Sequence, residues 1–266
     1  MKKLVAGLLT AVALLAMSAC GADQKNTAQT SSSTKESAEV SSGASEQVYT
    51  DPKEMKESYD VVIIGAGGAG MAAAIEAKDA GLNPVILEKM PVAGGNTSKS
   101  SSGMNASETK FQKEEGIKDS NDAFYEETLK GGGGTNDKEM LRYFVDHSAD
   151  AVDWLDQNGI KLDNFTITGW MSEKRTHRPS DGSAIGGYLV EGLLNNVHER
   201  EIPIFVNADV TDIKKNGETV NEVTVHVQGE EPKEVTGKAI VVTTGGFGAS
   251  KEFIEKYRPD LADYIT

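Results

Sequence analysis

The sequence predicts an α/β fold in which helices cover a parallel sheet, with a small antiparallel excursion late in the chain. Between residues 59 and 87, a run of β-branched residues is followed by glycines, a helix-forming segment and a second β-branched run. This order is typical of a βαβ unit. Residues 20–57 contain few large apolar side chains, so they cannot bury enough surface to fold. We therefore expect one folded domain over residues 58–266, after a leader and a disordered linker.

The chain opens with a targeting signal, MKKLVAGLLTAVALLAMSAC. Lys2 and Lys3 precede an apolar run of 14 residues, which is shorter than the about 20 residues that a spanning helix needs. The small residues before Cys20 make residues 1–19 a secretory signal that resembles those of bacterial lipoproteins. The resemblance implies that Cys20 carries lipid and anchors the protein to the bacterial cell membrane on its extracytoplasmic side. A plain secretory signal that is cut elsewhere is the alternative.

Residues 20–57 are rich in Ser, Thr and Glu and predict a disordered tether. Within this tether, Glu39 to Ser45 reads Glu-Val-Ser-Ser-Gly-Ala-Ser. The stretch is similar to the signal at which flavin mononucleotide (FMN) is attached covalently through a phosphoester. Glu39 stands where that signal has Asp, and Ser45 stands where it has Thr. Biased tracts produce such matches by chance, so a plain linker is the main interpretation and FMN on Ser45 the minor one.

Charge and cysteine content exclude several classes of function. The formal net charge is −14 and no basic patch is evident, which argues against a nucleic-acid partner and against electrostatic adhesion to anionic lipid. Attachment to a membrane would therefore depend on lipid at Cys20. Because Cys20 is the only cysteine, no cysteine cluster can hold zinc or an iron–sulfur centre. We expect no metal site.

The first elements of the predicted domain form a dinucleotide-binding unit. A buried strand over residues 59–64 runs into Gly-Ala-Gly-Gly-Ala-Gly, a helix follows over residues 71–80, and Gly81 ends it. A second strand over residues 84–87 leads into Glu88. A lone glycine motif is weak evidence, but strand, glycine turn, helix, strand and acid in this order predict a Rossmann-like domain.

Each residue of the glycine turn has a physical role in such a site. Gly65 permits the tight turn, Gly67 lets the backbone approach a pyrophosphate, and Gly70 lets the helix pack close to the strand. Ala69 lies at the helix N-terminus, whose free N–H groups favour phosphate. Glu88 lies 18 residues after Gly70, where its carboxylate can accept hydrogen bonds from ribose hydroxyls and would repel a 2′-phosphate. These features do not separate FAD from NAD.

The residues after Glu88 resemble a known family. The stretch Gly-Gly-Asn-Thr continues through Ser-Ser-Gly-Met-Asn-Ala to residue 106, similar to the soluble fumarate reductases, the flavocytochrome c and urocanate reductase group. The resemblance implies an FAD-binding domain in which Asn96, Thr97, Ser102 and Gly103 touch the cofactor. Relatives that bind their flavin covalently carry, in this segment, the His that forms the bond. This chain has none between residues 95 and 103, so we expect non-covalent FAD.

The middle of the chain offers weak catalytic candidates. An amphipathic helix is predicted over residues 137–158, after a loop of four glycines. His177 and Arg178 belong to the polar stretch Arg-Thr-His-Arg-Pro. His177 is a candidate general acid and Arg178 a candidate carboxylate ligand, although in the family the proton donor lies elsewhere. One His without a partner carboxylate does not make an acid–base site.

Three further strands are predicted near the end of the chain, over residues 203–210, 220–227 and 239–244. The second alternates, with Val223, Val225 and Val227 on one face, as in a half-buried antiparallel strand. The third is expected to be buried and to end in a glycine turn. The resemblance implies that Val210 meets the adenine side of FAD and that Gly245 lies against the nucleotide.

The resemblance implies an FAD-dependent oxidoreductase that acts on CH–CH groups. Its substrate would be a small unsaturated carboxylate such as fumarate or urocanate, reduced by hydride transfer from flavin N5 with electrons from an external donor. The resemblance covers the first half of a family member, and no position matches the family's substrate clamp or proton donor. The alternative is a truncated or split-gene fragment that binds FAD at most. A substrate-capturing lipoprotein without redox activity is a third interpretation, which the glycine turn disfavours.

Overall fold

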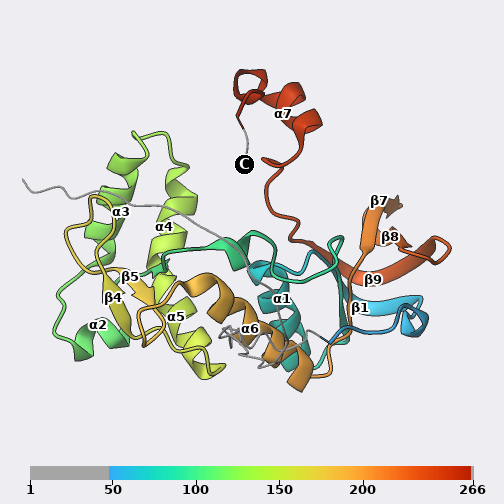
Figure 1. The fold of residues 1–266 in the computed structure, drawn as a ribbon, viewed down its shortest axis with the longest axis horizontal. Coiled ribbons are helices and arrows are strands. Elements are labelled where there is room, and N and C mark those ends of the chain that lie inside the picture. Colours follow the sequence, from blue (N-terminus) through green and yellow to red (C-terminus); the bar gives the residue numbers. More distant parts are fainter. Residues whose placement is uncertain (1–47, 265–266) are drawn as a thin grey trace, which may run out of the picture. The chain divides into compact units, whose positions relative to one another are not determined.

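The computed structural model describes residues 48–264, and its principal element is a six-stranded sheet (Figure 1). The strand order is β6-β2-β1-β9-β8-β7. These strands comprise β1 (Ser58–Ile64), β2 (Pro84–Leu87), β6 (Ile204–Phe205), β7 (Ala208–Asn216), β8 (Thr219–Val227) and β9 (Lys233–Val242). β6, β2, β1 and β9 are parallel, whereas β7, β8 and β9 form an antiparallel meander. The predicted fold class, a parallel sheet with helices and a small antiparallel excursion, is confirmed.

Seven α-helices occur among the described residues. They are α1 (Gly68–Asp79), α2 (Lys110–Glu114), α3 (Asn121–Gly131), α4 (Lys138–Asp146), α5 (Ser148–Gln157), α6 (Ile185–Glu199) and α7 (Lys251–Tyr257). Of these, α1 and α6 contact each other beside the parallel strands (Figure 1). No helix in residues 48–264 is long and apolar enough to cross a membrane.

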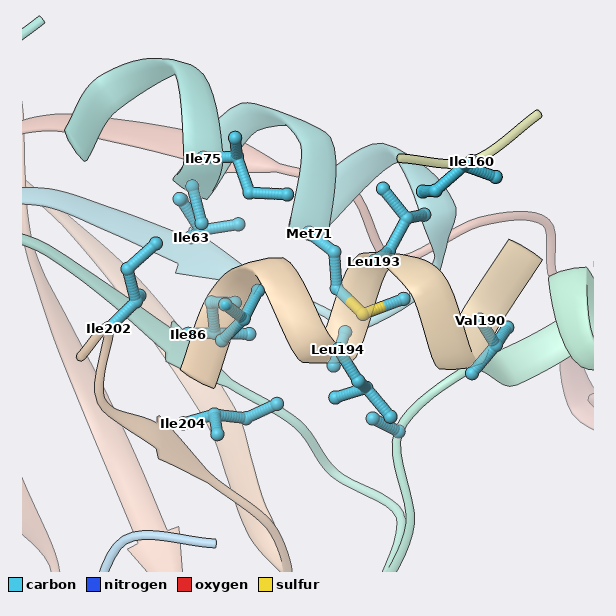
Figure 2. Close-up of a cluster of buried hydrophobic side chains, with 14 of the residues drawn as sticks. Ile63, Met71, Ile75, Ile86, Ile160, Val190, Leu193, Leu194, Ile202 and Ile204 are labelled. Carbon is cyan, nitrogen blue, oxygen red and sulfur yellow. The ribbon is translucent and has the colours of Figure 1, made fainter. Parts of the chain in front are cut away.

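Strands β1, β2 and β6 are buried on both faces because their side chains alternate between two cores. Val61 and Ile63 of β1 belong to the cluster formed with α1 and α6. Figure 2 shows Ile63 together with Met71 of α1 and Leu193 of α6. Burial of each such aliphatic side chain contributes about 1.5–3 kcal/mol. The intervening β1 residues Val62 and Ile64 pack instead with the buried valines of the antiparallel meander.

A second, three-stranded sheet holds the residues after the nucleotide loop. It comprises β3 (Met104–Asn105), β5 (Thr176–Arg178) and β4 (Asn164–Thr166), in that order and antiparallel. A small cluster of Ala106, Phe111 and Val152 packs beside it. The helix pair α3 and α4 has its own cluster, formed by Phe124, Leu141 and Val145.

The single helix predicted over residues 137–158 is wrong, because two helices meet there at His147. The backbone of His147 (φ −103°, ψ 7°) leaves helical geometry. The hydroxyl of Ser148 donates to the Val145 carbonyl and accepts from the Ser107 amide, so it ties the break to the segment that follows β3. Phe144 of α4 is 49% exposed. A side-chain hydrogen bond of this kind competes with helix continuation.

The later strands also differ in extent from their predictions. The strand expected over residues 203–210 is divided between β6 and β7, because Asn207 has a left-handed backbone (φ 50°) and starts a new direction. β8 is confirmed, with Val223, Val225 and Val227 buried. β9 begins earlier than expected, and it is not buried at its end, where Val242 is 59% exposed.

The folded part of the chain begins before residue 58. The Thr50 amide donates to the Ile204 carbonyl (3.0 Å), and Thr50 Oγ1 accepts from the Ile204 amide (3.1 Å). His198 Nε2 lies 2.8 Å from the Val48 carbonyl oxygen. Residues 48–57 were expected in the linker. They pack on the domain because Tyr49 has core contacts and the backbone beside it is hydrogen-bonded. The predicted signal (1–19), lipid site Cys20 and FMN site Ser45 lie outside the described residues.

Candidate cofactor site

The loop between β1 and α1 is a tight backbone turn. Gly65 has φ 104°, and a Cβ on it would lie 2.7 Å from the Thr243 carbonyl oxygen at the end of β9. A Cβ on Gly70 would lie only 1.9 Å from the Gly65 carbonyl oxygen. Real Cβ contacts are essentially never this close. Glycine at these two positions therefore lets the first turn of α1 pack directly on the strand ends.

The first turn of α1 leaves backbone open to a ligand. Gly67 is the N-cap residue of α1 and provides no capping side chain. A Cβ on Gly67 would be 3.9 Å from Thr97 Oγ1, its nearest neighbour, and Ala69 is exposed. N–H groups in the first turn of a helix lack partners within the helix and attract phosphate oxygens. The turn thus leaves room for a pyrophosphate to approach the backbone at Gly67, as the sequence predicts.

Glu88 lies directly against this turn and is 7% exposed. Its Oε2 accepts a hydrogen bond from the Ala66 amide (2.6 Å), and its Oε1 accepts one from the Met90 amide (2.7 Å). Hydrogen bonds to an ionised acceptor are shorter and stronger than neutral ones. The carboxylate therefore joins the glycine turn to the loop after β2, at the place where the sequence predicts ribose recognition.

The loop after β2 runs alongside the glycine turn. The Gly94 amide donates to the Ala66 carbonyl (2.8 Å), and Gly94 forms a parallel bridge with Gly67. A short 3-10 helix, η2 (Gly95–Lys99), follows. Within it Thr97 Oγ1 accepts from the Gly68 amide (3.1 Å), whereas Asn96 is exposed. Thr97 therefore contacts the start of α1. The exposed side chain of Asn96 is accessible to a ligand.

Ser102 and Gly103 continue from η2 into β3. The Ser102 carbonyl accepts from the Ile185 amide at the start of α6 (3.2 Å). A Cβ on Gly103 would lie 2.3 Å from the His177 carbonyl oxygen, so only glycine fits between β3 and β5. Arg178 reaches this segment, where Nη2 donates to the Ser101 carbonyl (3.1 Å). Its Nε is buried and has no hydrogen-bond partner among the described residues.

His177 is enclosed in the second sheet. Its side chain is fully buried, with Nε2 at 2.8 Å from Thr109 Oγ1 and Nδ1 at 2.7 Å from the Arg175 carbonyl oxygen. Burial lowers the pKa of His177 below its usual value and outweighs the opposing hydrogen bonds. The ring also packs edge-on against Phe165. With both nitrogens engaged, His177 has the surroundings of a structural residue and not those of a free general acid.

Arg175 is the centre of a buried ion-pair network beside His177. Its guanidinium donates through Nε and Nη2 to both carboxylate oxygens of Asp119 (each 2.7 Å) and through Nη1 to Glu127 (2.5 Å). Burial alone would lower the pKa of Arg175, but the two carboxylates raise it. Phe124 stacks under the guanidinium at 5.4 Å. These contacts satisfy the charge inside the protein, so the network holds the loop before α3, α3 itself and the start of β5 together.

Val210 and Gly245 are the remaining predicted contacts of the cofactor. Val210 is half-buried in β7, opposite Val225. Near it the Ala208 amide donates to the Glu88 carbonyl (2.8 Å). Gly245 follows β9, is exposed, and has φ 72°, with open space where a Cβ would lie. Glu88 and Gly245 thus follow β2 and β9, the strands on either side of β1.

The structure therefore brings one group of predicted residues together and separates another. The glycine turn, Glu88, Thr97 and Gly245 gather at the carboxyl ends of parallel strands, where ligands bind in open α/β sheets. His177 and Arg178 lie on the second sheet. Sequence reasoning missed residues that hold the site by packing: Gly94, Gly186, Thr243 and Tyr49. Gly186 is typical, since a Cβ there would lie 2.5 Å from the Ser98 carbonyl oxygen, and its only sequence signal is a Gly-Gly pair at a helix start.

The site fits a dinucleotide cofactor. The first turn of α1 offers approachable N–H groups. Gly245 and Gly95 have no close neighbour that a side chain would meet, and Arg178 Nε is a buried donor without a partner in the described residues. The described residues hold no group of three or more His, Cys, Asp or Glu side chains able to bind a metal ion. The fold and the glycine turn thus define a dinucleotide-binding domain.

Comparison with known proteins identifies the family. Residues 60–265 match the family model described as the FAD binding domain, and the chain belongs to that family. It is similar to the NADH:fumarate oxidoreductase of Klebsiella pneumoniae, with 50% identity over 79% of this chain. It is also similar to the urocanate reductase of Eggerthella lenta, with 32% identity over 80% of this chain. The chain thus belongs to a family of FAD-binding proteins, and over about four fifths of its length it is similar to proteins named for the reduction of fumarate or urocanate.

A solved structure shares the fold. The open conformation of a flavocytochrome c3 fumarate reductase matches 79% of this chain with a TM-score of 0.75 and 35% sequence identity. In each comparison the chain spans only part of the other protein. It covers 23% of the Klebsiella protein, 36% of the urocanate reductase and 38% of the flavocytochrome chain.

Proposed function

We propose that the protein is an FAD-dependent oxidoreductase that reduces the activated C=C bond of a small unsaturated carboxylate, with electrons from an external donor. The observation that carries the proposal is the joint occurrence of the glycine turn, Glu88 and the residues 94–106 segment in a chain 50% identical to a fumarate oxidoreductase over 79% of its length. When bound, FAD supplies the hydride for such a reduction.

The residues of this chain would act by binding and orientation. The first turn of α1 would hold the pyrophosphate through backbone N–H groups. Glu88 would present its carboxylate to the ribose, and Thr97, Ser102 and Gly103 would flank the extended cofactor. Binding of this kind fixes the position of the reactive ring relative to a substrate, and positioning contributes a large part of enzymatic rate enhancement.

The identity of the substrate and donor is proposed at the level of class. The similar proteins are named for fumarate and for urocanate, which share an alkene conjugated to a carboxylate. Arg178 is the one weak candidate here for a carboxylate ligand, since its Nη2 is engaged at Ser101 while its Nε is unpartnered in the described part of the chain. His177 has no open path to a substrate, so we assign it no proton transfer.

The alternative is a truncated or split-gene fragment that binds FAD at most and does not catalyse alone. The chain spans 23% to 38% of the compared proteins, and this partial coverage favours it. The two proposals share the cofactor site and differ in turnover. Turnover with a substrate therefore separates them, and a flavin spectrum alone does not.

The test begins with the purified chain after desalting. Its visible absorption spectrum gives the ratio of flavin to protein, and fumarate or urocanate is then added to the chain with a reduced viologen dye. About one FAD per chain with substrate-dependent dye oxidation supports the enzyme. The same ratio without oxidation supports the fragment. Absence of retained FAD contradicts the enzyme and supports the fragment.

We also propose that residues 1–19 are a signal peptide and that Cys20 carries lipid on the extracytoplasmic side of a bacterial membrane. The support is the charged, apolar and small-residue order before Cys20. The test is fractionation of cells that express the chain or Cys20→Ser. Membrane association of the parent and its loss in the variant are expected, and equal distribution would contradict the proposal. FMN on Ser45 is tested on the same samples by mass spectrometry.

A further inference from the structure

Tyr49 connects the segment before the domain to the cofactor loop. Its phenol oxygen accepts a hydrogen bond from the Ala93 amide (2.8 Å). Its ring is half-buried and packs on the core that contains Ala93. Ala93 itself is 4% exposed, so its amide has little access to water. The family match begins at residue 60, and Tyr49 lies outside it.

The Ala93 amide belongs to the loop that forms one side of the site. The next residue, Gly94, donates to the Ala66 carbonyl and bridges Gly67. Three residues further, Thr97 accepts from the Gly68 amide. A hydrogen bond at Ala93 therefore fixes the backbone immediately before the two residues, Gly94 and Thr97, that contact the glycine turn.

The residues on either side of Tyr49 are hydrogen-bonded to the domain. Thr50 exchanges two hydrogen bonds with Ile204, through its amide and its Oγ1. His198 Nε2 lies 2.8 Å from the Val48 carbonyl oxygen. The backbone on both sides of Tyr49 is thus anchored to α6 and β6, and the phenol projects from a fixed base.

We propose that Tyr49 is a positioning residue for FAD. Tyr49 holds the loop at Ala93–Thr97 in the conformation that contacts the glycine turn. Burial raises the pKa of Tyr49, and the charge of Glu88 adds to the effect. The phenol therefore stays neutral, and its oxygen remains an acceptor at ordinary pH. The inference rests on FAD binding and does not depend on the proposed reductase activity.

The test compares Tyr49→Phe with Tyr59→Phe in the full chain. Tyr59 is a matched control because its phenol oxygen accepts from a backbone amide, that of Lys56 (2.9 Å), and its ring is buried in the other core. Both variants lose one hydrogen bond to a backbone amide. Only Tyr49→Phe releases the cofactor loop.

The first readout is the dissociation constant of FAD, measured by titrating apoprotein and following flavin fluorescence. Tyr49→Phe is expected to raise this dissociation constant about five- to tenfold. The buried Ala93 amide loses its acceptor, so the loop conformation that binds FAD is less populated. Tyr59→Phe is expected to leave it unchanged. Equal constants for Tyr49→Phe and the parent, or an equal rise in both variants, would overturn the proposal.

The second readout is hydrogen exchange at residues 91–97 in the apoprotein, which needs no bound cofactor. Faster exchange is expected in Tyr49→Phe and parent-like exchange in Tyr59→Phe. Unchanged exchange in Tyr49→Phe would refute the proposal even if the parent retains no FAD. Failure of the parent to bind FAD would instead count against the proposed function.

Discussion

Gly70 and Gly65 approach so closely that a Cβ on Gly70 would lie 1.9 Å from the Gly65 carbonyl oxygen. The same Cβ would lie 2.8 Å from Thr243 Oγ1, whose hydroxyl is hydrogen-bonded to the Ile64 and Gly65 carbonyls (2.8 and 3.1 Å). Three chain segments, the end of β1, the start of α1 and the end of β9, therefore meet at one point without room for a methyl group.

Gly70→Ala is expected to abolish retention of FAD and to lower the melting temperature. The methyl group would overlap backbone, so α1 must move away from the strand ends, and overpacking costs about 1–3 kcal/mol or more. The flavin-to-protein ratio after desalting and thermal unfolding measure the two effects. Gly187→Ala in α6 is the control, since a Cβ there meets nothing within 4 Å and Ala stabilises helix interiors by about 0.5–1 kcal/mol. Parent-like FAD retention in Gly70→Ala would contradict the packing argument.

Glu88→Gln is expected to weaken FAD binding at least about tenfold, since removal of a charged hydrogen-bond partner costs about 1.5–3 kcal/mol. The amide nitrogen of Gln would face either the Ala66 or the Met90 amide, donor against donor, where the carboxylate accepts from both. Fluorescence titration with FAD measures the change. Glu230→Gln, at an exposed position, removes the same charge and should bind FAD like the parent. A similar loss in both variants would assign the effect to net charge.

Removal of the Arg175 guanidinium is expected to lower the free energy of unfolding substantially. Arg175→Met leaves the Asp119 carboxylate, whose side chain is 1% exposed, without its partner. Breaking a buried pair from one side costs about 3–5 kcal/mol. Arg142→Met removes an arginine that is 37% exposed and paired with Asp122 and Asp146, where exposed pairs contribute about 0–1 kcal/mol. Urea unfolding of both variants measures the difference. Equal losses would show that burial of the pair is energetically unimportant.

The lowered pKa of His177 predicts a pH dependence of stability. Burial disfavours the protonated ring in the folded state, so the unfolded chain binds more protons and the free energy of unfolding decreases as pH falls below about 6.5. The slope from one such group is at most about 1.4 kcal/mol per pH unit. The pKa of Asp79 is also lowered, by its hydrogen bond to Arg200, but its contribution is lost only below about pH 4.

Urea unfolding between pH 5 and 7.5 measures this slope. His177→Gln should be less stable at every pH, because the Thr109 and Arg175 contacts are lost, and should show a smaller slope. His226→Gln changes an exposed residue of β8 and should keep the slope of the parent. An unchanged slope in His177→Gln would show that another group titrates in this range.

The sequence predicted the parts of the site that follow from local rules. The glycine turn and the alternating valines of β8 each carry a signal within about ten residues, and the acid after β2 is recognised by its place 18 residues after Gly70. The fold confirms the elements that hold them. The break at His147 was not predictable because Leu141, Val145, Val152 and Leu155 keep helical spacing across it. Only the tertiary hydrogen bonds of Ser148 to Val145 and Ser107 reveal the break.

Long-range contacts account for the other differences. Tyr49 looks like part of a polar linker, because its partner Ala93 lies far along the chain and small residues give no pairing signal. His177 looks like a candidate acid in the sequence, and its burial depends on Thr109, Phe165 and Arg175 together. Polar residues enclosed by tertiary structure and polar residues in a cleft have the same local pattern.

β9 lies between β1 and β8, with Val61 of β1 paired to Ala239. On a ribosome, this partner of β1 emerges only after roughly 180 further residues, about 9–36 seconds later at ordinary rates of translation. Until then β1 has an unpaired edge, and unpaired edges template association with other chains. A sheet closed by so distant a strand also folds slowly. Newly made chains are therefore expected to expose β1 until β9 has been made, and yield in a heterologous host is expected to respond to chaperone supply as well as to the stability of the finished fold.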